Sequence, residues 1–219
     1  MISGPSGAGK GAICAGLAER TSAMLSVSMT TRAPRAGETE GKSYFFVDKE
    51  RFREAIDGGE LFEYAEVYGE YYGTPKAPVH AYLDKGKDVI LEIEVMGAMQ
   101  AREQLEEAKL IFIMPPSLEE LRRRIEARGT ETSEKIADRL ERAAMEIEYI
   151  EKYDYLVIND KLDKAVTDVL YIMHAERLYN NAPTMLFLSL SNATIMRRAG
   201  TMRIGEATRN IIEGFKQKL

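Results

Sequence analysis

The sequence contains very few cysteine and histidine residues. Cys14 is the only cysteine among 219 residues, which excludes an intrachain disulfide and a zinc site built from cysteines. Its position within an expected helix favours a buried apolar role. His80 and His174 lie far apart and neither is accompanied by a partner motif, so we assign both to structural or surface roles rather than to acid–base catalysis.

The sequence also lacks any long apolar run. A membrane-spanning helix needs about 18 or more apolar residues in succession, and none is present. The start of the chain shows no basic segment followed by an apolar one, which argues against a secretory leader. These two absences predict a cytoplasmic protein with no membrane contact.

A surplus of positive charge is missing as well. The net charge is −5, with 30% charged residues, which argues against broad binding to nucleic acid or to a membrane surface. A small phosphorylated ligand stays possible, because a few local arginines suffice to bind it. With 45% hydrophobic residues over 219 positions, the chain can bury the core of one α/β domain with inserts, or of two small domains.

The most informative glycines lie at the start of the chain. Gly4, Gly9 and Lys10 fit the G-x-x-x-x-G-K spacing of a phosphate-binding loop. Glycines allow a tight turn whose N–H groups approach phosphate oxygens, and a helix expected over residues 10–20 would direct its positive end at the same anion. The alternative is an ordinary glycine-rich turn. The candidate loop consists of Gly4, Pro5, Ser6, Gly7, Ala8, Gly9, Lys10 and Gly11.

One usual feature of such a loop is missing. A serine or threonine normally follows the lysine and binds magnesium through its hydroxyl, but Gly11 and Ala12 occupy the two positions after Lys10. The sequence therefore predicts an intact phosphate cradle without the usual protein ligand for the metal.

Short apolar runs alternate with helical patterns along the rest of the chain, which predicts an α/β fold with a parallel sheet flanked by helices. Three of the expected strands are apolar almost throughout, as parallel strands buried on both faces should be. The expected strands are residues 44–47, 89–93, 110–114 and 155–158, and the expected helices are residues 10–20, 77–85, 97–105, 118–128, 133–150 and 163–179.

The two ends of the sequence depart from this alternation. Only Met1, Ile2 and Ser3 precede the loop, which is half of the strand expected at the sheet centre. Either the strand starts upstream or another segment fills its place. Residues 184–191 form an apolar run that predicts a strand, which would either replace the missing half or be an extra edge strand or disordered tail. Residues 195–219 are basic and weakly helical.

Seven segments of the chain, none of them decisive alone, form an ordered set. They are residues 4–11, 26–35 (SVSMTTRAPR), 41–47 (GKSYFFV), 71–75 (YYGTP), 91–95 (LEIEV), 115–117 (PPS) and 128–130 (RGT). Together and in this order they resemble guanylate kinase, and the resemblance runs from residue 2 to about residue 172.

The resemblance implies a P-loop core over residues 1–27 and 76–175, with a lid at about 126–140 inside it. It also implies a small mixed α/β insert over residues 28–75 that binds GMP, whereas residues 176–219 form an atypical tail. The implied activity is transfer of the ATP γ-phosphate to GMP, giving GDP and ADP for purine nucleotide metabolism, with Mg²⁺ accompanying ATP.

The same resemblance implies residue roles. Lys10 and the backbone of residues 4–11 would bind the ATP phosphates, and Arg128 and Arg139 of the lid would bridge the two nucleotides. Lys10, Arg32, Arg128 and Arg139 would be the catalytic residues, and no residue is assigned with certainty to the metal. The GMP phosphate would be bound by Arg32, Arg35, Tyr44 and Tyr72, and the guanine by Ser28, Glu63, Thr74 and Glu94.

The chemistry of these residues is consistent with such roles. Arginine matches phosphate bidentately, and tyrosine hydroxyls add neutral donors. Guanine offers N–H donors that suit a carboxylate such as Glu63, whereas adenine would leave that carboxylate without its partners. The attacking group is the GMP phosphate itself, ionised at neutral pH because its second pKa is about 6, so no general base is needed. A lid that closes late would keep water away from ATP.

Each assignment also has a plainer alternative. Arg32 and Arg35 could be solvated loop charges, Tyr44 and Tyr72 packing residues, and Glu63 a surface carboxylate. Glu94 stands where the family usually has Asp, and Met96 where Gln is common, so nucleotide selectivity is open at these positions. With Gly11 and Ala12 after the lysine, we expect reduced activity. The alternative functions are a non-catalytic guanylate-kinase-like binding module and a kinase for another nucleoside monophosphate.

Overall fold

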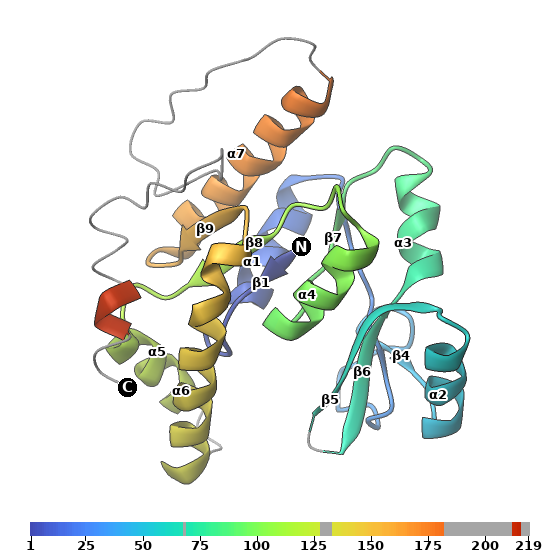
Figure 1. Ribbon diagram of the computed structural model, residues 1–219, viewed down its shortest axis with the longest axis horizontal. Helices are drawn as coiled ribbons and strands as arrows, with labels where there is room; N and C mark the ends of the chain where they lie inside the picture. The colour runs from blue at the N-terminus through green and yellow to red at the C-terminus, as the bar shows by residue number, and fades with distance from the viewer. Residues whose placement is uncertain (68, 128–132, 182–211, 216–219) are drawn as a thin grey trace. The chain divides into compact units, whose positions relative to one another are not determined.

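The computed structural model describes residues 1–67, 69–127, 133–181 and 212–215, with the backbone alone at 133 and 179–181. Contacts divide the chain into two compact units. The loop unit consists of Ile2–Glu19 and Lys109–Leu219, and the insert unit of Met1 and Arg20–Ala108. Figure 1 labels most of the elements of both, and each unit is described by itself.

The loop unit contains a parallel three-stranded sheet of order β1-β8-β9. Its strands are β1 (Ile2–Ser3), β8 (Ile111–Met114) and β9 (Tyr155–Ile158). All four residues of β8 are apolar and buried, as expected for an inner strand that is covered on both faces. The strands predicted over residues 110–114 and 155–158 are confirmed as β8 and β9. The expectation that the first strand lies at the sheet centre is wrong for this sheet, since β8 is the middle strand and pairs with β1 and β9.

Helices surround this sheet. They are α1 (Lys10–Arg20), α5 (Leu118–Glu126), α6 (Ser133–Ile147), the 3₁₀ helix η1 (Glu148–Lys152) and α7 (Leu162–Asn181). Ser117 caps the start of α5, where its Oγ accepts from the Glu120 N–H at 3.1 Å. The helix predicted over residues 133–150 ends as α-helix at Ile147 and continues as η1. A Cβ at Gly16 of α1 would lie 2.8 Å from Val166 Cγ2, so α1 and α7 pack closely.

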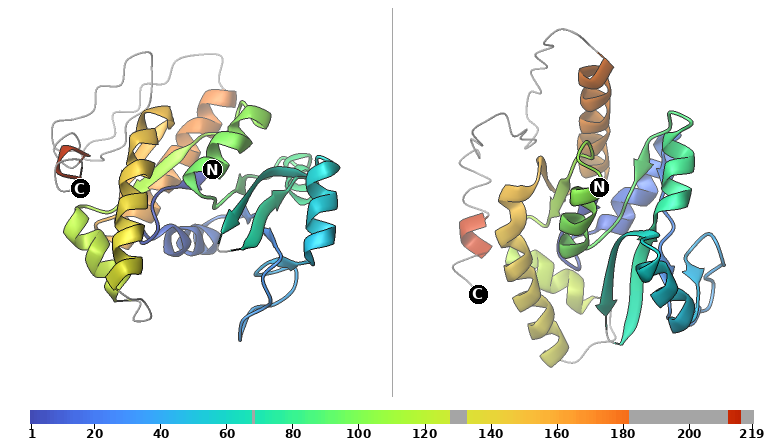
Figure 2. Two further views of the ribbon diagram at one scale, coloured as in Figure 1. Left: turned by 60° about the horizontal axis from the view of Figure 1, so that its bottom comes forward. Right: turned by 45° about the vertical axis from the view of Figure 1, so that its right-hand side comes forward.

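The insert unit is built on a mixed four-stranded sheet of order β4-β3-β6-β5. The strands are β3 (Met29–Thr30), β4 (Phe45–Phe46), β5 (Leu61–Val67) and β6 (Glu70–Pro75). Strands β5 and β6 form a long antiparallel pair (Figure 2), whereas β3 and β4 are parallel. Helix α2 (Lys49–Asp57) packs against the sheet through a core of Met29, Phe52, Ala55 and Leu61.

The rest of the insert unit consists of the parallel pair β2 (Met24–Leu25) and β7 (Val89–Ile90), with α3 (Lys76–Leu83) and α4 (Val95–Gln104). Helix α4 satisfies backbone groups of β5, the end strand of the mixed sheet. Gln100 Oε1 accepts from the Tyr64 N–H at 3.2 Å, and Gln104 Nε2 donates to the Phe62 carbonyl at 2.9 Å. These contacts protect an edge that could otherwise pair with another chain.

Several expectations fall outside the described residues. They concern the strand over 184–191, Arg128 and most of the hinge around it, and the basic tail apart from one helical turn at residues 212–215. Within that turn Phe215 is buried. Among the helices of the described chain, none is long and apolar enough to cross a membrane.

Candidate functional site

The loop between β1 and α1 has a backbone that only glycine adopts readily. Gly4, Gly7 and Gly9 have φ values of 139°, 91° and 92°. A Cβ at Gly4 would lie 2.1 Å from the Ile113 carbonyl oxygen, and one at Gly9 would lie 2.3 Å from Asn159 Nδ2. The loop is therefore pressed against the strands beneath it, and the glycine spacing recognised in the sequence is a steric requirement of this contact.

Lys10 begins α1 and folds back over the loop. Its Nζ donates to the Gly4 carbonyl at 2.6 Å and to the Pro5 carbonyl at 3.2 Å. The first turn of α1 contains no acidic residue, so its N–H groups and the positive end of its dipole are not offset by a carboxylate from that turn. The loop, Lys10 and the helix start together form an arrangement suited to an anion.

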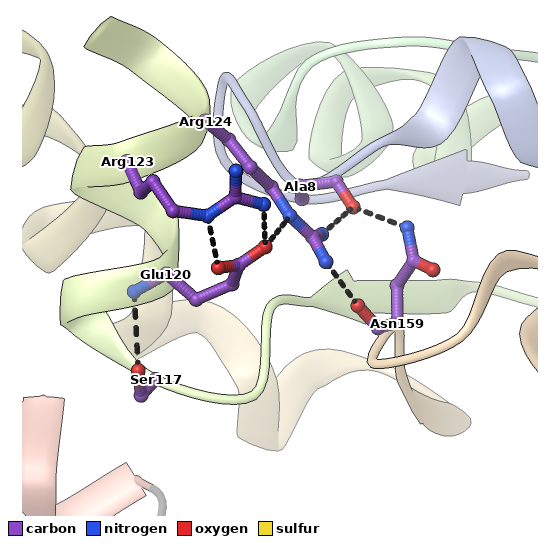
Figure 3. A network of polar contacts seen from close by, with 6 residues as sticks. All are labelled: Ala8, Ser117, Glu120, Arg123, Arg124 and Asn159. Carbon is purple, nitrogen blue, oxygen red and sulfur yellow. Dashed lines mark hydrogen bonds and ion pairs between the residues drawn. The ribbon is translucent and has the colours of Figure 1, made fainter. Parts of the chain in front are cut away.

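The Ala8 carbonyl of the loop is held by two residues that sequence reasoning missed (Figure 3). Asn159 Nδ2 donates to the Ala8 carbonyl at 2.8 Å, and Arg124 Nη1 reaches the same oxygen at 3.5 Å. Arg124 Nη2 also donates to the Asn159 carbonyl at 2.9 Å. The available signal was position, since Asn159 directly follows β9 and ligands of α/β folds bind near the carboxyl ends of parallel strands.

Arg124 is itself anchored by a carboxylate of its own helix. Its Nε donates to Glu120 Oε1 at 2.7 Å, and Arg123 makes two contacts of 2.7 Å with the same carboxylate. Hydrogen bonds from Arg123 and Arg124 lower the pKa of Glu120 to about 2. Glu120 is therefore negative throughout the physiological pH range.

One of the two arginines expected in the lid approaches the loop. Arg139 of α6 lies with Nη1 at 3.5 Å from Ser6 Oγ. The structure thus brings Arg139 to the loop, within the same unit as Lys10. Arg128, the other expected lid arginine, lies outside the described residues.

The positions after Lys10 do not fit a direct magnesium ligand. Gly11 and Ala12 are exposed on the first turn of α1 and have no side-chain oxygen. Across the described ranges, no group of three or more His, Cys, Asp or Glu side chains could hold a metal ion. A metal at this loop would receive no side-chain ligand from the two positions after Lys10.

In the insert unit, Arg32 is paired with a carboxylate that sequence reasoning did not single out. Its Nη1 and Nη2 donate to the two oxygens of Glu38 at 3.0 and 2.8 Å. Glu38 also accepts from the Arg35 backbone N–H at 2.7 Å. A carboxylate and a phosphate present similar pairs of oxygens to a guanidinium, so Glu38 occupies donors of Arg32 that match the geometry of a phosphate.

The aromatic residues assigned to phosphate binding lie beside Arg32. Its guanidinium carbon is 5.4 Å from the centre of the Tyr44 ring, which meets the Tyr72 ring edge-on at 6.1 Å. The Glu38 hydrogen bond is the main cause of a raised pKa for Arg32, and the Tyr72 hydroxyl contributes. Hydrogen bonds from Arg32 and the Arg35 N–H lower the pKa of Glu38 to about 2. The Arg35 side chain is exposed.

Glu63 and Thr74 meet on the neighbouring strands β5 and β6. Thr74 Oγ1 donates to Glu63 Oε1 at 2.6 Å, and Glu63 is only 7% exposed. Burial raises the pKa of Glu63, the charge of Glu94 adds to the rise, and the Thr74 hydrogen bond opposes it. A Cβ at Gly97 of α4 would lie 2.6 Å from Glu63 Oε2. The second carboxylate oxygen thus lies against bare backbone.

The other two residues assigned to the guanine differ in their surroundings. Glu94 is exposed at the start of α4, where it raises the pKa of Glu63 through its charge. Ser28 is half-buried, and its backbone carbonyl accepts from the Phe45 N–H at 2.8 Å. No contact of the Ser28 side chain identifies it as a ligand within the described structure.

Comparisons with known proteins cover most of the chain. The family model described as guanylate kinase matches residues 1–176. A guanylate kinase of Clostridium tetani is 52% identical over 177 residues, covering 81% of this chain and 85% of that protein. One from Caldanaerobacter subterraneus subsp. tengcongensis is 47% identical over 196 residues, covering 89% and 95%. The crystal structure of guanylate kinase from Anaplasma phagocytophilum matches with a TM-score of 0.66 and 39% identity, covering 81% of this chain and 84% of that one.

Proposed function

The chain belongs to the guanylate kinase family, and we propose that it transfers the γ-phosphate of ATP to GMP, giving GDP and ADP. The observation that carries the choice of GMP is the buried carboxylate of Glu63, fixed by Thr74 on one oxygen. A fixed buried acceptor selects for a base with N–H donors and against one that would leave it unpaired.

ATP is the nucleotide proposed for the loop unit. The N–H groups of residues 4–11 and the start of α1 would bind its phosphates, with Lys10 supplying a point charge. The Lys10 contacts with the Gly4 and Pro5 carbonyls place its ammonium over the loop before any ligand arrives. Arg139, near Ser6, is a further cation for the phosphates. We also propose Arg128 as a second cation of the lid, and this assignment rests on the family resemblance alone.

Arg32, Arg35, Tyr44 and Tyr72 are proposed to bind the GMP phosphate. The support is the cluster of Arg32 with both rings and the pairing of Arg32 with Glu38. That pairing orients the guanidinium toward oxygen atoms of an anion, as a phosphate requires. For the guanine we propose Glu63 and Thr74 as direct partners, with Glu94 acting through its charge and Ser28 assigned by resemblance.

The chemistry requires alignment and charge neutralisation rather than a base. The phosphate of GMP is already the nucleophile, because its second pKa of about 6 leaves it ionised at neutral pH. Phosphoryl transfer passes through a loose transition state, so Lys10, Arg32, Arg128 and Arg139 would act by holding the two phosphates in line and offsetting their charge. When bound to the ATP phosphates, Mg²⁺ supplies further positive charge and keeps several of its waters.

A coupled assay of ADP release with ATP and Mg²⁺ tests the proposal. GMP, AMP, dGMP and UMP serve as acceptors in parallel. We expect turnover with the guanine nucleotides and none with AMP or UMP. Turnover with AMP or UMP would instead identify a kinase for another nucleoside monophosphate. Measurable GMP binding without any ADP release would identify a non-catalytic binding module and overturn the proposed activity.

A further inference from the structure

The carbonyl oxygen of Ala8 in the phosphate-binding loop is held by two side chains from distant elements (Figure 3). Asn159, at the end of β9, donates from Nδ2 at 2.8 Å, and Arg124, in α5, approaches with Nη1 at 3.5 Å. Arg124 Nη2 also donates to the Asn159 carbonyl at 2.9 Å, so the two residues that contact the Ala8 oxygen are bonded to each other as well. Ala8 and Asn159 are both buried.

Fixing this carbonyl fixes the peptide that joins Ala8 to Gly9. A peptide unit is planar and trans, so its C=O and N–H point in opposite directions. With the Ala8 oxygen directed at Arg124 and Asn159, the Gly9 N–H points away from both. Gly9 has a positive φ of 92°, and a Cβ there would lie 2.3 Å from Asn159 Nδ2, so the loop backbone and Asn159 are in close contact.

Arg124 is restrained at the same time by its own helix. Its Nε donates to Glu120 Oε1 at 2.7 Å, and its side chain is 21% exposed. The neighbouring Arg123 also contacts Glu120 at 2.7 Å, but its side chain is 68% exposed. The two arginines therefore share a carboxylate. Arg124 in addition contacts the carbonyl oxygens of Ala8 and Asn159, as Figure 3 shows.

We propose that Arg124 is a positioning residue for the phosphate-binding loop. Together with Asn159 it holds the Ala8 carbonyl away from the phosphate site, so that the Gly9 N–H is directed at the ATP phosphates before ATP binds. Preorganised donors of this kind cost no reorganisation when the charge arrives. The inference rests on the proposed ATP site, and it gives a structural task to an arginine within the run Arg122–Arg124 that would otherwise be counted as solvated surface charge.

The test compares two matched variants of the full chain, Arg124→Gln and Arg123→Gln. Both lose one hydrogen-bonded partner of Glu120, and only the first loses the contacts with Ala8 and Asn159. For Arg124→Gln we expect the Kd of MgATP, measured by calorimetry without GMP, to rise at least about tenfold, since a hydrogen bond from a charged group is lost. The Kd of GMP should stay within about twofold for both variants, and that of MgATP likewise for Arg123→Gln.

A second measurement separates positioning from direct contact with ATP. In nucleotide-free protein labelled with ¹⁵N-glycine, the Gly9 amide resonance should shift in Arg124→Gln and stay in place in Arg123→Gln. If Arg124 acted only by touching ATP, the Gly9 resonance of the nucleotide-free protein would not change. Arg124→Lys keeps the charge and most of the aliphatic stem, so it covers the case in which the glutamine variant does not fold. A lysine cannot reproduce the fork of contacts, and we expect a shift in the same direction.

Three results would overturn the inference. They are an unchanged Gly9 resonance in both Arg124 variants, equal effects of the Arg123 and Arg124 substitutions, and an equal loss of MgATP and GMP affinity. Failure of the proposed function is distinguishable, because the wild-type chain would then bind no MgATP or release no ADP while the Gly9 measurement could still be made.

Discussion

Glu63 is a carboxylate that the fold keeps away from water. Its raised pKa, caused first by burial, means that the folded chain holds the charged form less favourably than the unfolded chain does. The stability contributed by this group is therefore present below its ordinary pKa and is lost as the pH rises through the raised pKa. A group kept at such a cost fits a binding role, because the proposed guanine N–H donors would supply the missing partners.

Replacing Glu63 with glutamine should therefore separate stability from binding. Glu63→Gln removes the buried charge, so we expect the melting temperature at neutral pH to be unchanged or higher. The amide would face guanine donors with its own N–H groups, and the KM for GMP should rise about 50-fold, corresponding to about 2–3 kcal/mol for a charge-assisted hydrogen bond. Thermal unfolding and ADP-release assays measure the two effects.

The exposed Glu66 of the same strand provides the matched control. Glu66→Gln should change neither the melting temperature nor the KM for GMP by more than a small amount. The pH dependence gives a further check, because GMP binding should weaken as the pH falls through the raised pKa of Glu63 and its carboxylate becomes protonated. The Glu63→Gln variant should lose that part of the dependence. A Glu63→Gln enzyme with unaltered KM for GMP would disprove the guanine role.

Gly11 occupies the position from which a hydroxyl usually reaches the metal. Gly11→Ser restores that hydroxyl on the exposed first turn of α1, and we expect kcat to rise by several-fold, about 1 kcal/mol for one added ligand hydrogen bond or metal contact. The Mg²⁺ concentration needed for half-maximal activity should fall at the same time. Ala15→Ser, on an exposed position further along α1, is the control. No change in kcat would show that ATP phosphates and water suffice.

At the scale of elements, the close approach of α4 to β5 depends on one residue. Gly97 leaves room for Glu63 Oε2, since a Cβ there would lie only 2.6 Å from that oxygen. The same helix covers the edge of β5 through Gln100 and Gln104. A helix placed this close fixes the depth at which the Glu63 carboxylate lies, so the element contact shapes the proposed guanine site.

Gly97→Ala tests this contact. Alanine favours the helix by about 1 kcal/mol over glycine, which offsets part of the strain, so we expect little loss of melting temperature. The displaced carboxylate should nevertheless raise the KM for GMP about tenfold while leaving the KM for ATP unchanged. Glu103→Ala changes an exposed residue of the same helix and should alter neither constant. Equal KM values for Gly97→Ala and the wild type would mean that Glu63 is not the acceptor for guanine.

At the scale of the whole molecule, the proposed nucleotide sites are assigned to different compact units. Lys10 and the loop belong to one unit, and Arg32 and Glu63 to the other. Each unit has its own buried side chains around its own sheet. Binding of one nucleotide alone should therefore depend on residues of one unit.

This division predicts separable effects on binding. Lys10→Ala should lower kcat at least about 100-fold, because a cation at the transferring phosphate is lost, yet leave the Kd of GMP within about twofold. Glu63→Gln should raise the Kd of GMP and leave that of MgATP unchanged. The double variant should combine the kcat loss of Lys10→Ala with the GMP affinity loss of Glu63→Gln, since the free-energy effects of distant sites add. Calorimetry with each nucleotide alone measures these constants, and a cross-effect above about threefold would contradict the division.

Local pattern was enough to determine several elements. The glycine spacing located the loop, α1 begins at Lys10 as expected, and the apolar runs located β8 and β9. The cap of α5 is also local, since the Ser117 hydroxyl accepts from the N–H of Glu120, three residues later. Such features can be predicted because a turn, a cap or a buried strand is specified by residues adjacent in the chain. The family resemblance assigned Glu63 and Thr74 to the same pocket, and in the structure Thr74 Oγ1 lies 2.6 Å from Glu63 Oε1.

Other features depended on contacts between residues distant in the sequence. The hydrogen bonds from Arg124 and Asn159 to the Ala8 carbonyl connect residues more than a hundred positions apart in the sequence. The fit of Gly97 against Glu63, and the interruption of the helix predicted over residues 133–150, likewise have no local signature. Residues adjacent in the chain were enough to predict a phosphate-binding loop, because such a loop depends on short-range backbone freedom and charge. How that loop is held could be seen only in the folded chain, because burial and hydrogen bonding between remote segments do not exist before folding.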